Sequence, residues 1–233
     1  MSPAKILIFD FDDTLIKTPI LKNATPNTNY KIYGDEYIPE EQIQKIKDNF
    51  KRWLDAGIKI CILSLAYSKE LKEFFIDVLK FKNVTLFVNS ENTVDKNILI
   101  MGTPSITVYD KFKDKPEIFK VDMMEIFLQH LRLMTSPGPL PKIQFMDDNY
   151  GTCNYMKTKF KEDVVSVHHI TPRGNVDMTF KVADEFVSSQ FRPTKIIKNR
   201  HKSPPFKNKN KNKKKRTVKS KSRRKSRSPR RRV

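Results

Sequence analysis

The feature that most constrains this chain is an apolar run near its start that ends in three carboxylates. Residues 6–9, Ile-Leu-Ile-Phe, carry no charge and predict a strand buried on both faces of a sheet. Asp10, Asp12 and Asp13 follow directly. Carboxylates gathered at the end of a buried strand repel one another and lose hydration, which is costly unless a cation or a reaction uses them. The pattern therefore favours a functional site over an ordinary acidic turn.

The chain up to residue 170 alternates between apolar strands and amphipathic helices, which favours a parallel sheet with helices on both faces. Folds of this class bind ligands beyond the carboxyl ends of their strands. A second acidic pair, Asp147 and Asp148, ends the apolar segment 142–148. We therefore expect both acidic clusters to meet at one edge of the sheet around Mg²⁺, whose preference for oxygen ligands suits carboxylates.

Helices are predicted where apolar side chains recur every three or four residues, and strands where short apolar runs occur. The predicted helices are 40–56, 68–78, 116–133, 154–160 and 177–191, and the further strands are 58–64, 84–88, 142–148 and 164–170. Ser68 is expected to cap its helix. Two hairpins are also expected, one pairing residues 20–21 with 30–33 and one pairing residues 98–101 with 106–109.

The segment Asp10-Phe11-Asp12-Asp13-Thr14 resembles the first motif of the haloacid dehalogenase (HAD) superfamily of phosphatases, in which a strand ends in Asp-x-Asp-x-Thr or Asp-x-Asp-x-Val. The resemblance implies that Asp10 accepts the phosphoryl group and binds Mg²⁺. It implies that Asp12 lends its backbone carbonyl to the metal, while its side chain acts first as general acid and then as general base. Asp13 has no role in this scheme and is interpreted as a turn residue.

Three further signals follow in the order of the superfamily's motifs. Ser64 ends the second strand, where the resemblance implies a hydroxyl that binds the phosphoryl group, although Ser is common at strand ends. The motif lysine is Lys115 or Lys120, unless both are solvated surface residues. Lys115 is slightly preferred because it directly precedes a predicted helix N-terminus, whereas the spacing to the second acidic pair favours Lys120. Asp147 and Asp148 resemble the fourth motif and would support the metal.

The resemblance covers about residues 5–170 and implies a HAD-like, Rossmann-like three-layer sandwich with a minimal cap. The intervals in which superfamily members carry a lid domain have room here for little more than hairpins. An open site suits a phosphate on a macromolecule, because a large substrate can itself exclude water. The nearest functional models are the polynucleotide 3′-phosphatases and the phosphoprotein phosphatases. The alternative is a nucleic-acid-binding or packaging protein that uses the fold without turnover.

The formal charge of +20 is spread unevenly along the 233 residues. From Arg192 to Val233 there are 21 Lys and Arg and no Asp or Glu, whereas residues 1–191 have a net charge of −1. The charge distribution therefore predicts a near-neutral globular domain over 1–191, which the resemblance implies is a HAD-like phosphatase domain, and a disordered basic tail over 192–233. The tail favours nucleic acid or another polyanion as a partner, and is equally compatible with nuclear localisation.

The remaining signals are negative or structural. Cys61 and Cys153 make no disulfide framework and match no zinc spacing. His168 and His169 are interpreted as structural, because adjacent residues on a strand face opposite ways. No apolar run approaches the roughly 20 residues of a membrane span, so we expect a soluble, intracellular protein without membrane contact. The sequence leaves the oligomeric state open.

Overall fold

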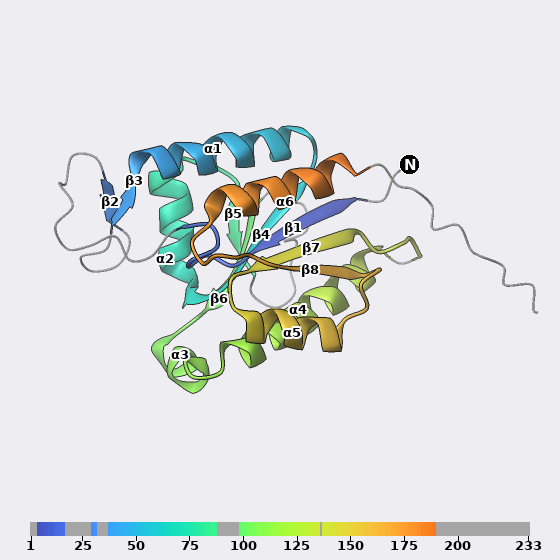
Figure 1. Ribbon diagram of the computed structural model, residues 1–233. Coiled ribbons are helices and arrows are strands. Elements are labelled where there is room, and N and C mark those ends of the chain that lie inside the picture. Colours follow the sequence, from blue (N-terminus) through green and yellow to red (C-terminus); the bar gives the residue numbers. More distant parts are fainter. Residues whose placement is uncertain (1–3, 17–28, 32–36, 88–97, 136, 190–233) are drawn as a thin grey trace, which may run out of the picture. The chain divides into compact units, whose positions relative to one another are not determined.

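The computed structural model describes residues 4–16, 29–31, 37–87, 98–135 and 137–189. Its central feature is a six-stranded sheet in which every neighbouring pair of strands is parallel (Figure 1). In order across the sheet, the strands are β5 (Val84–Leu86), β6 (Ile98–Thr103), β4 (Lys59–Tyr67), β1 (Lys5–Phe9), β7 (Lys142–Asp147) and β8 (Val165–His169). The two strands predicted to end in carboxylates, β1 and β7, are therefore direct neighbours.

Helices cover both faces of this sheet (Figure 1). On one face lie α1 (Glu40–Asp55), α2 (Ser68–Glu73) with its π-helical continuation η1 (Phe74–Val78), and α6 (Val176–Ser188). On the other lie α4 (Pro116–Thr135) and α5 (Tyr150–Lys159), and the short α3 (Ile106–Phe112) precedes α4. The predicted α/β sandwich with a parallel central sheet is thus confirmed.

Strand β1 is buried on both faces, as the uncharged run predicted. Leu7 and Phe9 pack into the layer of α1, α2 and α6, whereas Ile6 and Ile8 pack into the layer of α4 and α5. The Phe9 ring stacks on Trp53 of α1 with a centroid separation of 5.6 Å. Burial of this apolar surface on both faces holds the strand end, and the carboxylates after it, in a fixed position.

The hairpin predicted from residues 98–101 and 106–109 is wrong. The first segment belongs to β6, which lies between β4 and β5 in the central sheet and is buried at all six residues. The second forms α3, because the Ser105 side chain accepts a hydrogen bond from the Val108 N–H (3.4 Å) and caps a helix. Short apolar runs do not distinguish a buried central strand from a hairpin strand.

Other boundaries also differ from the prediction. Strand β2 (Asn29–Lys31) pairs with β3 (Tyr37–Pro39), and residues 20–21, the predicted partner, lie outside the described residues. Ser68 is the first helical residue of α2 rather than its cap. Helix α5 begins four residues early, because Asn149 caps it by accepting from the Thr152 N–H (3.0 Å). The predicted tail also lies outside the described residues.

Among the helices that the structure describes, none is both long enough and apolar enough to span a membrane.

Candidate metal centre at the carboxyl edge of the sheet

Three buried carboxylates meet at the carboxyl ends of β1 and β7. Asp10 directly follows β1, and its N–H donates to the Met146 carbonyl of β7 (2.9 Å). Asp147 ends β7, and Asp148 follows it. One oxygen from each of the three carboxylates lies within 4.8 Å of the others, and this group could hold a metal ion. The predicted convergence of the two acidic clusters is therefore confirmed.

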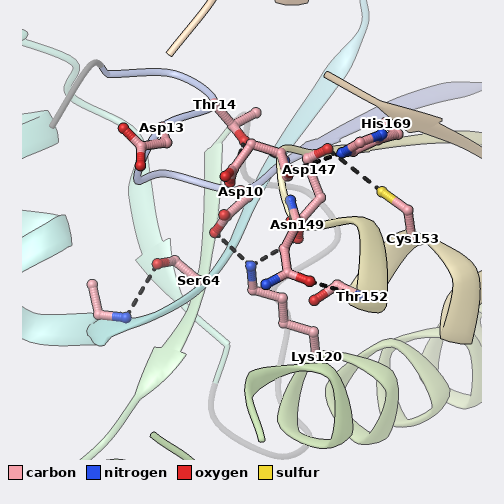
Figure 2. A network of polar contacts seen from close by, with 12 residues as sticks. Asp10, Asp13, Thr14, Ser64, Lys120, Asp147, Asn149, Thr152, Cys153 and His169 are labelled. Atoms are coloured by element: carbon pink, nitrogen blue, oxygen red, sulfur yellow. Dashed lines mark hydrogen bonds and ion pairs between the residues drawn. The ribbon is translucent and has the colours of Figure 1, made fainter. Parts of the chain in front are cut away.

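Lys120 lies between two of these carboxylates (Figure 2). Its Nζ is 2.9 Å from Asp10 Oδ1 and 2.7 Å from Asp147 Oδ2, and only 4% of the residue is exposed. Lys115, which the sequence slightly favoured, is exposed and lies just before the first residue of α4. The preference for Lys115 is therefore wrong. The second turn of α4, which carries Lys120, faces the carboxylates, whereas Lys115 precedes the helix.

Burial gives this cluster unusual electrostatics. Burial raises the pKa of Asp10 well above its usual value, and the nearby Asp147 and Asp12 act in the same direction against the opposing charge of Lys120. Burial also opposes the charge on Lys120, but Asp10 and Asp147 outweigh it and raise the pKa of the lysine. Lys120 is therefore charged at neutral pH. Arg173, whose Nε donates to Asp148 Oδ2, adds a second positive charge beside the three carboxylates, so a cation or a proton would compensate the remaining negative charge.

Asp148 is held by contacts from several segments. The Thr14 hydroxyl accepts from the Asp148 N–H (3.0 Å) and donates to its Oδ1 (3.4 Å). The Nε of Arg173 donates to Asp148 Oδ2 (2.5 Å), and Nε2 of His169 lies 2.8 Å from the Asp148 carbonyl oxygen. Sequence reasoning assigned no role to Arg173 and did not connect His169 with this site. Of these three residues, only Thr14 was indicated by the sequence, through its place in the first motif.

Replacing Thr14 by valine should destabilise the protein by about 1–3 kcal/mol, because the buried N–H of Asp148 would lose its acceptor. Urea unfolding measures this change in the free energy of unfolding. Thr14→Ser is the matched control, since it keeps the hydroxyl and should retain most of the stability. A loss for Thr14→Ser without a loss for Thr14→Val would instead mean that the threonine methyl group, and not its hydroxyl, stabilises the site.

Asp147 is the most enclosed of the three carboxylates, with an exposed fraction of 0%. Its Oδ1 accepts from the N–H of Asn149 (2.7 Å), the residue that caps α5, while Oδ2 contacts Lys120. The neighbouring Cys153 thiol lies 3.5 Å from the Asp147 carbonyl oxygen. Burial and the charge of Asp147 raise the pKa of Cys153 to about 12, so this cysteine remains a thiol at neutral pH.

The other predicted site residues lie around this group. Asp12 is half-buried and close enough to influence the pKa of Asp10, but its carboxylate is not among the three that converge. Asp13 has a φ of 55° in a tight turn, and its carbonyl accepts from the Gly174 N–H (2.7 Å). The interpretation of Asp13 as a turn residue is therefore confirmed.

Ser64 lies on β4, the strand next to β1 on the side away from β7. It is two residues beyond Ile62, the partner of Phe9, and therefore reaches the level of the carboxylates. The serine is buried, and its Oγ accepts from the N–H of Ala66 (3.1 Å) (Figure 2). Strand β4 continues to Tyr67, so Ser64 does not end the strand as predicted.

Comparison of the chain with protein-family models gives no match, and a search of curated proteins gives no match either.

Proposed function

We propose that this protein is a Mg²⁺-dependent phosphatase of the HAD type, which hydrolyses a phosphomonoester on a macromolecule through an aspartyl phosphate on Asp10. The observation that carries the proposal is the buried contact of Asp10 with Lys120, beside a second carboxylate pair at the carboxyl edge of a parallel sheet. The resemblance of the first motif to that of the superfamily supports the reaction class.

The donor set suits Mg²⁺, because all three converging side chains offer carboxylate oxygens and their negative charge exceeds that of the nearby cations. Asp10, Asp147 and Asp148 would hold the ion, together with the backbone carbonyl of Asp12. When bound, Mg²⁺ would neutralise charge on the phosphate and on the attacking carboxylate.

In the first step, Asp10 attacks phosphorus with Oδ2, since Lys120 contacts Oδ1. The bond from phosphorus to the leaving oxygen breaks, and Asp12 donates its proton to that oxygen. In the second step, the Asp12 carboxylate takes a proton from water, whose oxygen attacks the phosphoryl group. Inorganic phosphate leaves and the Asp10 carboxylate is regenerated. The Ser64 hydroxyl would donate a hydrogen bond to a phosphoryl oxygen.

A macromolecular substrate is supported by the small size of the segments available as a cap. Within the described residues, the structure added between β1 and α1 is the antiparallel pair of β2 and β3, with three residues in each strand. We propose a nucleic-acid end or a phosphoprotein as substrate, and an intracellular, nuclear setting in which residues 192–233 bind a polyanion. Binding without turnover is the alternative.

Mg²⁺ tests the proposal directly. Added to the metal-free protein, it should start phosphate release from p-nitrophenyl phosphate and stabilise the fold by about 2.7 kcal/mol at 100 times its Kd. The affinity should increase as the pH rises through the elevated pKa of Asp10, because the metal displaces a proton. Thermal unfolding and a phosphate assay, each repeated with EDTA, measure both effects.

Asp148→Asn should lose most of the stabilisation by Mg²⁺, whereas Asp55→Asn, at an exposed position on α1, should keep it. A protein that neither binds Mg²⁺ nor releases phosphate would contradict the proposal.

A further inference from the structure

An exposed aromatic ring lies directly beside the carboxylate cluster. Tyr150, the first residue of α5, is 70% exposed and follows Asp148 by only two residues. Two residues span at most about 7 Å, so the tyrosine begins within reach of any group bound at the cluster. A single exposed aromatic side chain is normal on a protein surface, and its meaning here depends on what holds it.

The Tyr150 ring is supported by a residue that also contacts the candidate metal centre. Its centroid lies 5.6 Å from that of His169, with the two rings inclined at 68°. His169 in turn places Nε2 at 2.8 Å from the Asp148 carbonyl oxygen. The edge-to-face contact orients the tyrosine while most of it remains exposed. The contact with His169 thus leaves an open ring surface on a residue next to the carboxylate cluster.

Arg173 provides a cation at the same rim. Its Nε donates to Asp148 Oδ2, and 70% of its side chain is exposed. Nη2 lies 3.7 Å from Asp13 Oδ2, which is longer than a hydrogen bond. The outer donors of the guanidinium therefore remain suited to an incoming acceptor, and their planar arrangement matches phosphate oxygens.

We propose that Tyr150 and Arg173 form a subsite for the end of a single-stranded polynucleotide whose terminal phosphate is the substrate. This inference rests on the proposed phosphatase function. The base next to the terminal phosphate stacks on Tyr150, and the following phosphodiester accepts hydrogen bonds from Arg173.

Two observations favour a polynucleotide over a phosphoprotein. Asn154 and Lys157 are exposed and lie four and seven residues after Tyr150, so they share one face of α5 with it. This face presents polar side chains to a strand that leads away from the cluster. Residues 192–233 also carry 21 Lys and Arg and no Asp or Glu, and this positive charge attracts a polyanion. A phosphoserine peptide has no obligatory planar group beside its phosphate for the ring to stack on.

The test compares two substrates of the full-length protein with Mg²⁺ present. The readout is kcat/KM for a single-stranded oligonucleotide, with a 3′- or 5′-phosphate, divided by kcat/KM for p-nitrophenyl phosphate. Tyr150→Ala should lower this ratio about tenfold, an effect within the range of base–aromatic stacking. Tyr150→Phe should preserve the ratio, as should Leu133→Ala, which truncates an 80% exposed side chain on α4.

Arg173 has a separate readout. Arg173→Gln should reduce the slope of log KM against log salt concentration for the oligonucleotide by about one, as expected for the loss of one phosphate contact. A merely structural role for the arginine would leave this slope unchanged.

The outcomes separate this subsite from the proposed function. Hydrolysis of p-nitrophenyl phosphate, combined with a higher kcat/KM for a phosphoserine peptide than for the oligonucleotide, would overturn the subsite and leave the phosphatase intact. So would an unchanged substrate ratio in Tyr150→Ala or an unchanged salt slope in Arg173→Gln. Absence of phosphate release from every substrate by the wild-type protein would instead overturn the proposed function, and the subsite with it.

Discussion

Asp10→Asn should abolish phosphate release, with kcat falling on the order of 10³-fold or more, as is typical when a nucleophile is removed. An amide is a poor nucleophile and carries no charge, so the covalent step loses its attacking group. The substitution preserves the shape of the side chain. Its amide oxygen can still accept a hydrogen bond from Lys120, whose Nζ lies 2.9 Å from Asp10 Oδ1 in the wild-type protein. Initial rates with p-nitrophenyl phosphate and Mg²⁺ measure the effect.

Asp13→Asn is the matched control, because it makes the same chemical change three residues away. Asn tolerates the left-handed conformation that Asp13 adopts at φ 55°, so the turn should persist. This variant should retain activity within a few-fold of the wild type. Equal phosphate release by Asp10→Asn and the wild-type protein would exclude Asp10 as the nucleophile.

Lys120→Met should cost about 3–5 kcal/mol of the free energy of unfolding in EDTA, the range for a buried charge pair that loses one partner. Methionine approximates the length of the lysine side chain, whereas the carboxylates of Asp10 and Asp147 lose the cation that lies 2.9 and 2.7 Å from them. Urea unfolding measures the loss, and Mg²⁺ should recover part of it by supplying a replacement cation.

The deficit in Lys120→Met should shrink as the pH falls. Burial already holds the pKa of Asp10 above its value in the unfolded chain, so the native state binds its proton more tightly. The contribution of Asp10 to stability is then fully present below the unfolded pKa and is lost as the pH rises through the folded pKa. Removing the lysine strengthens this dependence, because its charge opposes the upward shift.

Lys115→Met is the control for position. Lys115 is exposed, and substitutions at such sites usually change stability by less than about 0.5 kcal/mol. A loss for Lys115→Met as large as that for Lys120→Met would contradict the assignment of Lys120 to the carboxylates.

The meeting of Asp10 with Asp147 and Asp148 was predictable because it follows from a topological rule. Parallel strands with crossover helices place all their carboxyl ends at one edge, so residues after two buried strands converge there, even when more than 130 residues separate them. The adjacency of β1 and β7 brings the carboxylate oxygens within 4.8 Å of one another.

The choice between Lys115 and Lys120 was not predictable in the same way. It depends on where α4 begins and on which of its faces packs against the sheet, and a shift of one residue rotates a helix by about 100°. The helix begins at Pro116, which leaves Lys115 outside it and turns Lys120 toward Asp10 and Asp147. Residue spacing along the chain contains no direct measure of that rotation.

From the order of residues alone, the sheet class, the acidic strand ends and their convergence could be derived, because hydrophobic periodicity and strand direction are local properties of the chain. Contacts from segments distant in sequence determined the rest: Lys120 between two carboxylates, and Arg173 and His169 on Asp148. Such contacts arise from side-chain packing between elements, where a change of a few ångströms exchanges an ion pair for solvent.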